Sequence, residues 1–186
     1  MYSKSGEITL IRSKVARRYA KAIFSLGKED GNFEQYGKEL KEFSNLLEQN
    51  RELSIFLLSR LIPLESRQGV LKKVLEKVGF SEVTNRFLML LLEKERMDQL
   101  DGIWRYYEKL MDEAMNIVRA EIITPIPLSD SQRERLENAL ATFTGKKVKS
   151  VVNTDPSLIG GVLVKIGDMV LDGSIKAQLE GLKQSI

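Results

Sequence analysis

The sequence contains neither cysteine nor histidine among its 186 residues. That absence excludes disulfides, thiol nucleophiles, serine–histidine relays and the zinc sites that use these two residues as ligands. An enzyme that uses only carboxylates and lysines is the remaining catalytic alternative, but no motif gathers acidic residues into a convergent cluster. We therefore expect no catalytic residue, no metal site and no bound cofactor.

Long apolar runs are also missing. No stretch approaches the ~20 apolar residues that a helix needs to span a bilayer. Residues 1–12 contain no apolar core followed by a cleavage site. Any association with a membrane is therefore expected to occur through partner proteins.

Charge of one sign is not in large excess either. Lys and Arg number 29 and Asp and Glu 26, which leaves a net charge of +3 with both signs interspersed. Binding to nucleic acid needs clustered cations, and the densest cluster, Lys146, Lys147 and Lys149, has no interleaved aromatic residues. The glycines match neither a Walker pattern nor GxGxxG. The sequence therefore predicts no nucleic-acid or nucleotide partner.

Helical periodicity dominates the first two-thirds of the chain. Apolar residues of the first segment recur at three- and four-residue spacing, namely Val15, Ala16, Tyr19, Ala20, Ile23 and Phe24. Similar patterns follow until the spacing changes. The predicted helices run from Val15 to near Gly27, from Phe33 to about Gln49, around residues 53–57, from Leu71 to Val78, from Ser81 onward, and from Leu100 to near Ile117.

The fifth predicted helix carries six consecutive apolar residues, from Phe87 to Leu92. Such a helix is apolar around its whole circumference, so it cannot present a full face to water. It is either a central helix enclosed by its neighbours or one that also receives a helix of another protein on part of its surface. In the sixth helix, Trp104 is expected to be a core anchor rather than a binding residue.

The last third changes character. Near Ile117 the apolar period shifts from 3.6 to 2, which predicts a strand that ends before Pro125. Ser129 and Gln132 have capping-box spacing ahead of a helix that Gly145 ends. A strand from Val148 to Val152, a hairpin with Gly167-Asp168 as a type II′ turn, and a final helix carrying Ile175, Leu179 and Leu182 follow.

The predicted fold class is α+β, mostly α. Residues 1–115 are expected to form an N-terminal six-helix bundle, and residues 116–186 a small C-terminal α+β domain with a β-hairpin. The chain is long enough for two small domains, each with its own core.

Four segments, in order along the chain, carry a family resemblance. They are residues 15–24 (VARRYAKAIF), residues 87–96 (FLMLLLEKER), residues 120–130 (AEIITPIPLSD) and residues 155–174, which begin DPSLIGGV and end GDMVLDGS. Together they resemble the delta subunit of F-type ATP synthase, the family of the mitochondrial oligomycin-sensitivity-conferring protein. Two positions depart from the family pattern: Gly27 stands where alanine is common, and Arg67-Gln68 replaces a usual lysine pair.

The resemblance implies a non-catalytic stator connector that acts during proton-driven ATP synthesis. In that family the N-terminal bundle binds the N-terminal helix of one alpha subunit, in a groove between the first and fifth helices, at the top of the catalytic head. The C-terminal domain meets the far ends of the b subunits of the peripheral stalk, which keeps the head from turning with the rotor. The absence of a transit peptide at Met1 favours the cytoplasmic face of a bacterial plasma membrane over a chloroplast thylakoid.

Two sets of positions follow from the resemblance. The alpha-subunit groove comprises Ala16, Tyr19, Ala20 and Ile23 on the first helix and Phe87, Leu90, Leu91 and Lys94 on the fifth. The matched motif positions with an architectural role are Gly160, Gly161, Gly167, Asp168, Asp172 and Gly173.

A bundle-core role is the alternative for each groove position. Leu90 is the residue expected to face outward, because Phe87 and Leu91 share one side at four-residue spacing. An unrelated helical protein-interaction adaptor is the alternative function, since a helical fold does not fix function. The C-terminal hairpin motif favours the delta family over such an adaptor.

Overall fold

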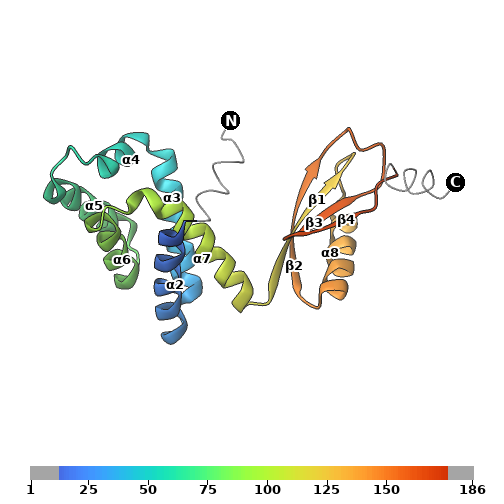
Figure 1. The fold of residues 1–186 in the computed structure, drawn as a ribbon, viewed down its shortest axis with the longest axis horizontal. Coiled ribbons are helices and arrows are strands. Elements are labelled where there is room, and N and C mark those ends of the chain that lie inside the picture. The colour runs from blue at the N-terminus through green and yellow to red at the C-terminus, as the bar shows by residue number, and fades with distance from the viewer. Residues whose placement is uncertain (1–12, 176–186) are drawn as a thin grey trace. The chain divides into compact units, whose positions relative to one another are not determined.

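The computed structural model describes residues 13–175. Contacts between Cα atoms divide the chain into two compact units, Met1–Met111 and Asp112–Ile186. Each unit has a hydrophobic cluster of its own. The protein is mostly helical, with a small mixed sheet of four strands near its C-terminus (Figure 1).

Helices make up the first unit. Their bounds are α2 Lys14–Glu29, α3 Phe33–Gln49, α4 Arg51–Leu58, α5 Leu64–Val78, α6 Glu82–Glu93, the 3₁₀ turn η1 Met97–Gln99, and α7 Leu100–Ala114 (Figure 1). Each overlaps a predicted helix, but the ends differ. Helix α5 begins at Leu64, ahead of the predicted start at Leu71, α2 runs past Gly27 to Glu29, and α7 ends at Ala114, before Ile117. The η1 turn was not predicted.

The helix ends follow local chemistry. The Ser13 and Ser81 hydroxyls accept hydrogen bonds from backbone N–H groups in the first turns of α2 and α6, which satisfies donors that a helix leaves unpaired. Gly79 ends α5 in the left-handed conformation, at φ 73°. Asn116, at φ 54°, lies in the turn after α7, so Ile117 begins a strand instead of extending the helix stripe.

The core of the first unit is built around α6 and α7. Leu88 and Leu91 of α6 and Ile103 of α7 are fully buried. Tyr107 is buried too, and its hydroxyl donates to the Phe33 carbonyl oxygen at 2.7 Å. The predicted core anchor on this helix was Trp104, but that ring is only half-buried and lies under the Lys41 ammonium. Tyr107 fills the core because it faces α2 and α3, where its ring meets Phe24 edge to face.

The second unit is a four-stranded sheet covered by one helix. Its elements are β1 Ile117–Thr124, α8 Asp130–Thr144, β2 Lys147–Thr154, β3 Leu163–Ile166 and β4 Met169–Asp172. The strand order is β2-β1-β3-β4, with β1 parallel to β2 and antiparallel to β3, and β3 antiparallel to β4. The crossover through α8 is what permits the parallel pair.

Alternation decides which face of this sheet is buried. Ala120 and Ile122 of β1 pack with Val164 of β3 and Leu140 of α8 in one cluster. The opposite face carries Val151, which is 61% exposed. The predicted capping box is confirmed, since Ser129 and Gln132 bond each other's backbone N–H groups at the start of α8.

The glycine motif closes the sheet. A Cβ at Gly161, which has φ 85°, would lie 2.3 Å from the carbonyl oxygen of Gly173, so only glycine fits there. Asp172 accepts a hydrogen bond from the Ser174 N–H, which shapes the turn after β4. Gly167 has φ 57° and Asp168 does not have a positive φ, as the predicted type II′ hairpin requires. The predicted helix through Leu179 and Leu182 lies outside the described residues.

Candidate partner-binding surface on α2 and α6

An aromatic contact joins α2 to α6, two helices that lie side by side in Figure 1. The rings of Tyr19 and Phe87 meet edge to face, with their centroids 6.3 Å apart. Both helices present a buried side to the core of the first unit. The surface on either side of this ring pair is where a groove between the first and fifth predicted helices would lie.

Half of the predicted groove positions are core residues in this structure. Ala16, Ala20 and Leu91 have no exposed surface, and Ile23 is 1% exposed. These side chains fill the space between α2, α6 and their neighbours, so they present no surface to a partner here. Their small or branched side chains set how closely the helices approach.

The other four positions lie at the surface or beside it. Tyr19 is half-buried and Phe87 is 9% exposed. Leu90 is 40% exposed, as its helical position predicted, and Lys94 is exposed at the C-cap of α6. Leu90 also borders a surface hollow of about 520 Å³ between α5 and α6.

Sequence reasoning missed the residues that complete this surface. Val15, Ala22 and Leu26 share a stripe of α2 with Tyr19, at spacings of four, three and four residues. Leu26 is 51% exposed and Val15 is half-buried. We call the apolar surface formed by these side chains on α2 and α6 the seam: Val15, Tyr19, Ala22, Leu26, Val83, Phe87 and Leu90.

The signal for the seam was present in the sequence. The core stripe of α2, Ala16-Ala20-Ile23, begins one residue after the seam stripe, which rotates it by about 100° around the helix. Because the two stripes are adjacent and both apolar, periodicity alone shows them as a single wide stripe. On α6, Val83 and Leu90 likewise lie one residue before the fully buried Thr84 and Leu91.

A buried carboxylate holds the N-terminal end of α6. Glu39 of α3 is 7% exposed and accepts hydrogen bonds from the Ser81 N–H at 2.9 Å and the Ser81 hydroxyl at 2.6 Å. Burial alone would raise the pKa of Glu39, but the hydrogen bonds from Ser81 and its neighbours outweigh that effect and hold the pKa below its usual value. The positive end of the α6 dipole also stabilises a carboxylate at this place.

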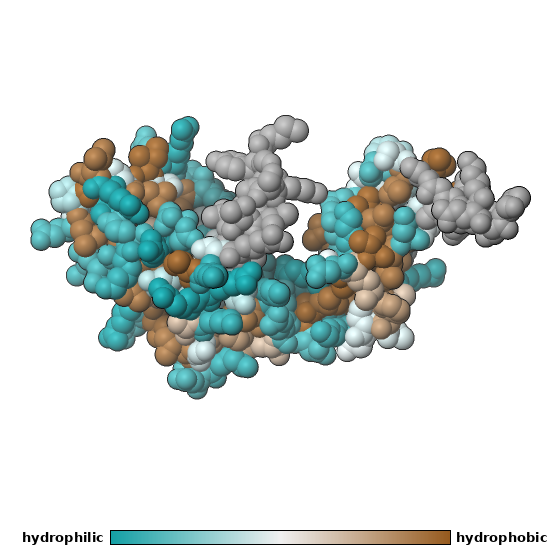
Figure 2. All heavy atoms as spheres, viewed as in Figure 1, coloured by the Kyte–Doolittle hydropathy of each residue, from teal (hydrophilic) through white to brown (hydrophobic). Residues whose placement is uncertain are grey.

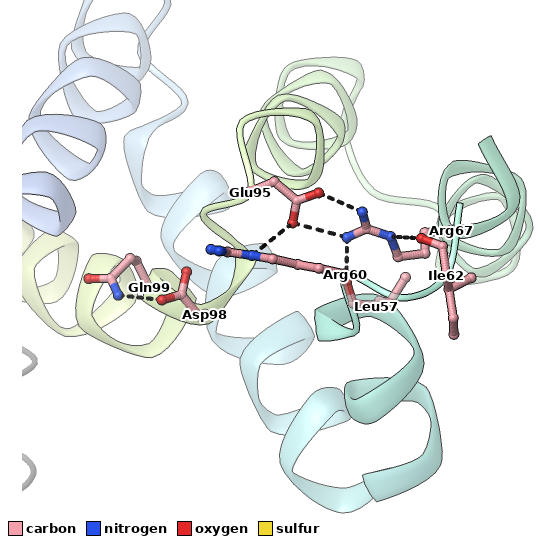
Figure 3. Close-up of polar contacts among 7 residues, drawn as sticks. All are labelled: Leu57, Arg60, Ile62, Arg67, Glu95, Asp98 and Gln99. Atoms are coloured by element: carbon pink, nitrogen blue, oxygen red, sulfur yellow. Dashed lines mark hydrogen bonds and ion pairs between the residues drawn. The ribbon is translucent and has the colours of Figure 1, made fainter. Parts of the chain in front are cut away.

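A buried guanidinium holds the chain just after the C-terminal end of α6 (Figure 3). Arg67 of α5 is 3% exposed, and its two terminal nitrogens donate to the Glu95 carboxylate at 2.5 and 3.2 Å. Its remaining hydrogen bonds go to the backbone carbonyls of Leu57 and Ile62, at 3.3 and 3.1 Å. Arg60 approaches the same carboxylate at 3.7 Å.

The geometry of this network suits arginine better than lysine. The planar guanidinium reaches a carboxylate and two carbonyls in different directions at once, which the single ammonium of a lysine does not do with the same geometry. Glu95 has φ 54°, an uncommon conformation for a residue with a side chain, and its pairing with Arg67 favours that turn. The Arg67 hydrogen bond holds the pKa of Glu95 below its usual value.

The part of the chain from Ser13 to Ile175 contains neither a metal-binding cluster nor a membrane-spanning helix. No group of three or more acidic side chains there is placed to hold a metal ion. No helix in that range has both the length and the apolar character needed to cross a bilayer. The α2–α6 seam is therefore the candidate site.

Comparison with known proteins decides the family. A family model described as ATP synthase delta (OSCP) subunit matches residues 15–186. The chain belongs to the ATP synthase delta (OSCP) subunit family. It is thus a subunit of an F-type ATP synthase, and the alternative of an unrelated helical adaptor is set aside.

Bacterial relatives match the delta subunit along most of its length. The ATP synthase subunit delta of Desulfosudis oleivorans is 44% identical over 172 residues, which are 92% of this chain and 94% of that protein. The protein of the same name from Geobacter metallireducens is 40% identical over 174 residues, or 94% and 97% of the two chains.

A solved structure shares the fold of this delta subunit. A chain of the mitochondrial ATP synthase hexamer of Toxoplasma gondii aligns with a TM-score of 0.68 at 19% identity, covering 93% of this chain and 97% of that one.

The first prediction concerns Glu95. Because its pKa is lowered in the folded delta subunit, the ionised carboxylate stabilises the fold above about pH 4.3, and this contribution is lost as the pH falls through the folded-state pKa. We expect Glu95→Gln to lower the melting temperature at pH 7. The difference in melting temperature between this variant and the parent should shrink as the pH falls below about 4.3. Glu93→Gln, an exposed neighbour, is the control and should melt like the parent. An equal difference at pH 3 and pH 7 would contradict the charge-based account.

The second prediction separates seam from core on α6. Leu91→Asp places a charge where the side chain has no exposed surface, so it should cost about 4 kcal/mol or more of unfolding free energy. Leu90→Asp changes a residue that is 40% exposed and should cost less than about 1 kcal/mol. Urea titrations of the two variants measure this contrast. Similar losses in both would show that Leu90 is a core residue.

Proposed function

We propose that this delta subunit is a non-catalytic stator connector of the ATP synthase. In this proposal residues 1–115 form a six-helix bundle that binds the N-terminal helix of one alpha subunit on the catalytic head. Residues 116–186 bind the C-terminal ends of the b subunits in the peripheral stalk. The connection holds the head against the torque of the rotor during proton-driven ATP synthesis.

The α2–α6 seam is the observation that carries the first half of the proposal. It presents apolar surface on both helices, with exposed Leu26 on α2 and exposed Leu90 on α6, and the Tyr19–Phe87 ring pair joins the two helices. An amphipathic helix docks into such a strip through apolar anchors at spacings of three and four residues. Burying one leucine side chain stabilises such a complex by about 1.5 to 3 kcal/mol.

The anchoring of α6 makes the seam a pre-formed surface. Glu39 fixes its start and Arg67 fixes the turn after its end, so α6 need not be ordered when the partner arrives. Binding to an ordered surface avoids the entropy cost of arranging it, which leaves more of the contact energy as affinity.

The open face of the sheet supports the second half of the proposal. Helix α8 covers one face, while Val151 and Val170 remain 61% and 56% exposed. Figure 2 shows hydrophobic side chains gathered on the second unit in this view. The same face carries the Glu121–Lys165 ion pair beside these valines, so it offers both apolar and charged contacts to a helix such as the end of a b subunit.

The proposed location is the cytoplasmic face of a bacterial plasma membrane, where the subunit is peripheral and reaches the membrane only through its partners. The bacterial origin of the relatives supports this placement. Family membership and the residues present support a mechanical rather than a catalytic role, with no cofactor.

The third prediction tests the seam. Leu26→Asp and Leu90→Asp each replace an exposed apolar anchor with a charge, so each should weaken binding to the catalytic head about tenfold or more, with little change in melting temperature. Ile55→Asp is the control, because Ile55 is 58% exposed on α4, away from the seam. Calorimetry with the alpha-subunit N-terminal peptide gives the affinities. Parent-like affinity in both seam variants would place the groove elsewhere.

The fourth prediction tests the division of labour. A fragment of residues 1–115 contains α2 to α7 with the whole core of the first unit, so it should fold alone and bind the alpha-subunit peptide. It should not bind the b dimer. Size-exclusion chromatography with each partner measures both outcomes, and retention of b binding by the fragment would contradict the two-site arrangement.

A further inference from the structure

We propose that a row of cations on α2 recognises an acidic edge on the helix that occupies the seam. This inference rests on the proposed function, because it gives the chemistry of the partner at that same site. The row consists of Lys14, Arg18 and Lys21. Their spacings of four and three residues place them on one stripe of α2, and all three are exposed.

The row lies directly beside the seam. The three stripes of α2 begin at successive residues, so the cationic row at Lys14, the seam at Val15 and the core at Ala16 follow one another at steps of about 100° around the helix. Arg18 links the cationic row to the seam, since its guanidinium lies 5.5 Å from the centre of the Tyr19 ring. A helix seated on the seam would therefore have the row along one of its edges.

Positive charge predominates on this helix, whose one acidic residue is Glu29 at its C-terminal end. No acidic residue occurs from Ser13 to Lys28. Within residues 13–175 no carboxylate forms an ion pair with Lys14, Arg18 or Lys21.

The row also opposes the stability of its own helix. The first turn of a helix carries the positive end of its dipole, where cations are unfavourable. Lys14 lies in that turn, and the first turn of α2 has no acidic residue to offset it. A charge pattern that costs helix stability without a partner inside the described chain points to a partner outside it.

The partner chemistry follows from the shape of the charged surface. From Lys14 to Lys21 the row extends about 10 Å along the axis, which is two turns of an apposed helix. It is one residue wide and borders an apolar strip, so it fits an amphipathic helix with Asp or Glu along one side of its apolar face.

A nucleic acid or an anionic membrane is less well matched to this surface. Nucleic-acid binding uses broad clusters of cations, often with aromatic rings open to stack on bases. Tyr19 is instead engaged with Phe87. Both ligands remain measurable outcomes of the test.

The effect of the row should appear mainly in the rate of association. Exposed ion pairs contribute little to affinity one by one, whereas a row of like charges steers an oppositely charged partner and is screened by salt. Head binding should therefore depend on ionic strength through these three residues.

The experiment compares two full-length triple variants with the same change in charge. K14Q/R18Q/K21Q removes the row, and the control K38Q/K73Q/K77Q removes three exposed cations from α3 and α5. Association with the catalytic head of the same organism is measured by stopped flow at 20 and 500 mM KCl. We expect the row variant to associate about tenfold more slowly than the parent at low salt and within about twofold at high salt. The control should remain within about twofold at both.

A second titration identifies the chemistry on the partner. The alpha-subunit N-terminal peptide is compared with a copy in which every Asp and Glu is replaced by Asn or Gln. The parent should bind the neutral copy more weakly at low salt, and the row variant should bind both alike.

The outcomes separate this inference from the proposed function. If Leu26→Asp weakens head binding about tenfold or more while the row variant matches the control, the seam stands and the acidic edge is wrong. If neither change affects head binding, the proposed function fails first. If the row variant binds the head normally but loses binding to vesicles of phosphatidylglycerol or to single-stranded DNA, the row serves that ligand and the inference is overturned.

Discussion

The fixed position of α6 is the constraint on which the first unit depends. Its inner side, with Leu88 and Leu91, fills the core, and its outer side, with Leu90, borders the seam. A helix that serves both purposes must not rotate or slide. A rotation of one residue, about 100°, would exchange buried and exposed leucines, and apolar contacts alone distinguish such positions poorly on a helix with six consecutive apolar residues.

Polar contacts supply that distinction. Glu39 bonds the cap of α6 at one end, and Arg67 bonds Glu95 just beyond the other. Each joins residues that are at least 28 positions apart in the sequence, so each forms only when several helices are in place together. Buried charged groups are costly unless they are fully bonded, and that cost disfavours packings in which α6 is displaced.

Different contacts hold the elements of the two units in place. The first relies on side-chain packing of helices, with caps that end each one. The second is small, and its sheet is closed by backbone features: the left-handed Gly161 against Gly173 and the hairpin turn at Gly167. Substitution at Gly161 would push the chain away from Gly173, because the approach is tighter than any side chain permits.

The sequence by itself determined the presence of the main helices, the ends at Gly79 and Gly145, the capping box of α8 and the period change at β1, because these depend on spacing and on neighbours a few residues apart. That Leu90 is exposed while Leu91 is buried was predictable for the same reason. Tertiary structure alone decided that Ala16 and Ala20 are core residues while Ala22 and Leu26 are exposed, and that Tyr107 rather than Trp104 fills the core. It also decided the pairing of Arg67 with Glu95. Which of two adjacent apolar stripes is covered depends on where the neighbouring helices lie. Periodicity shows which residues share a face of one helix, but not the positions of the other helices.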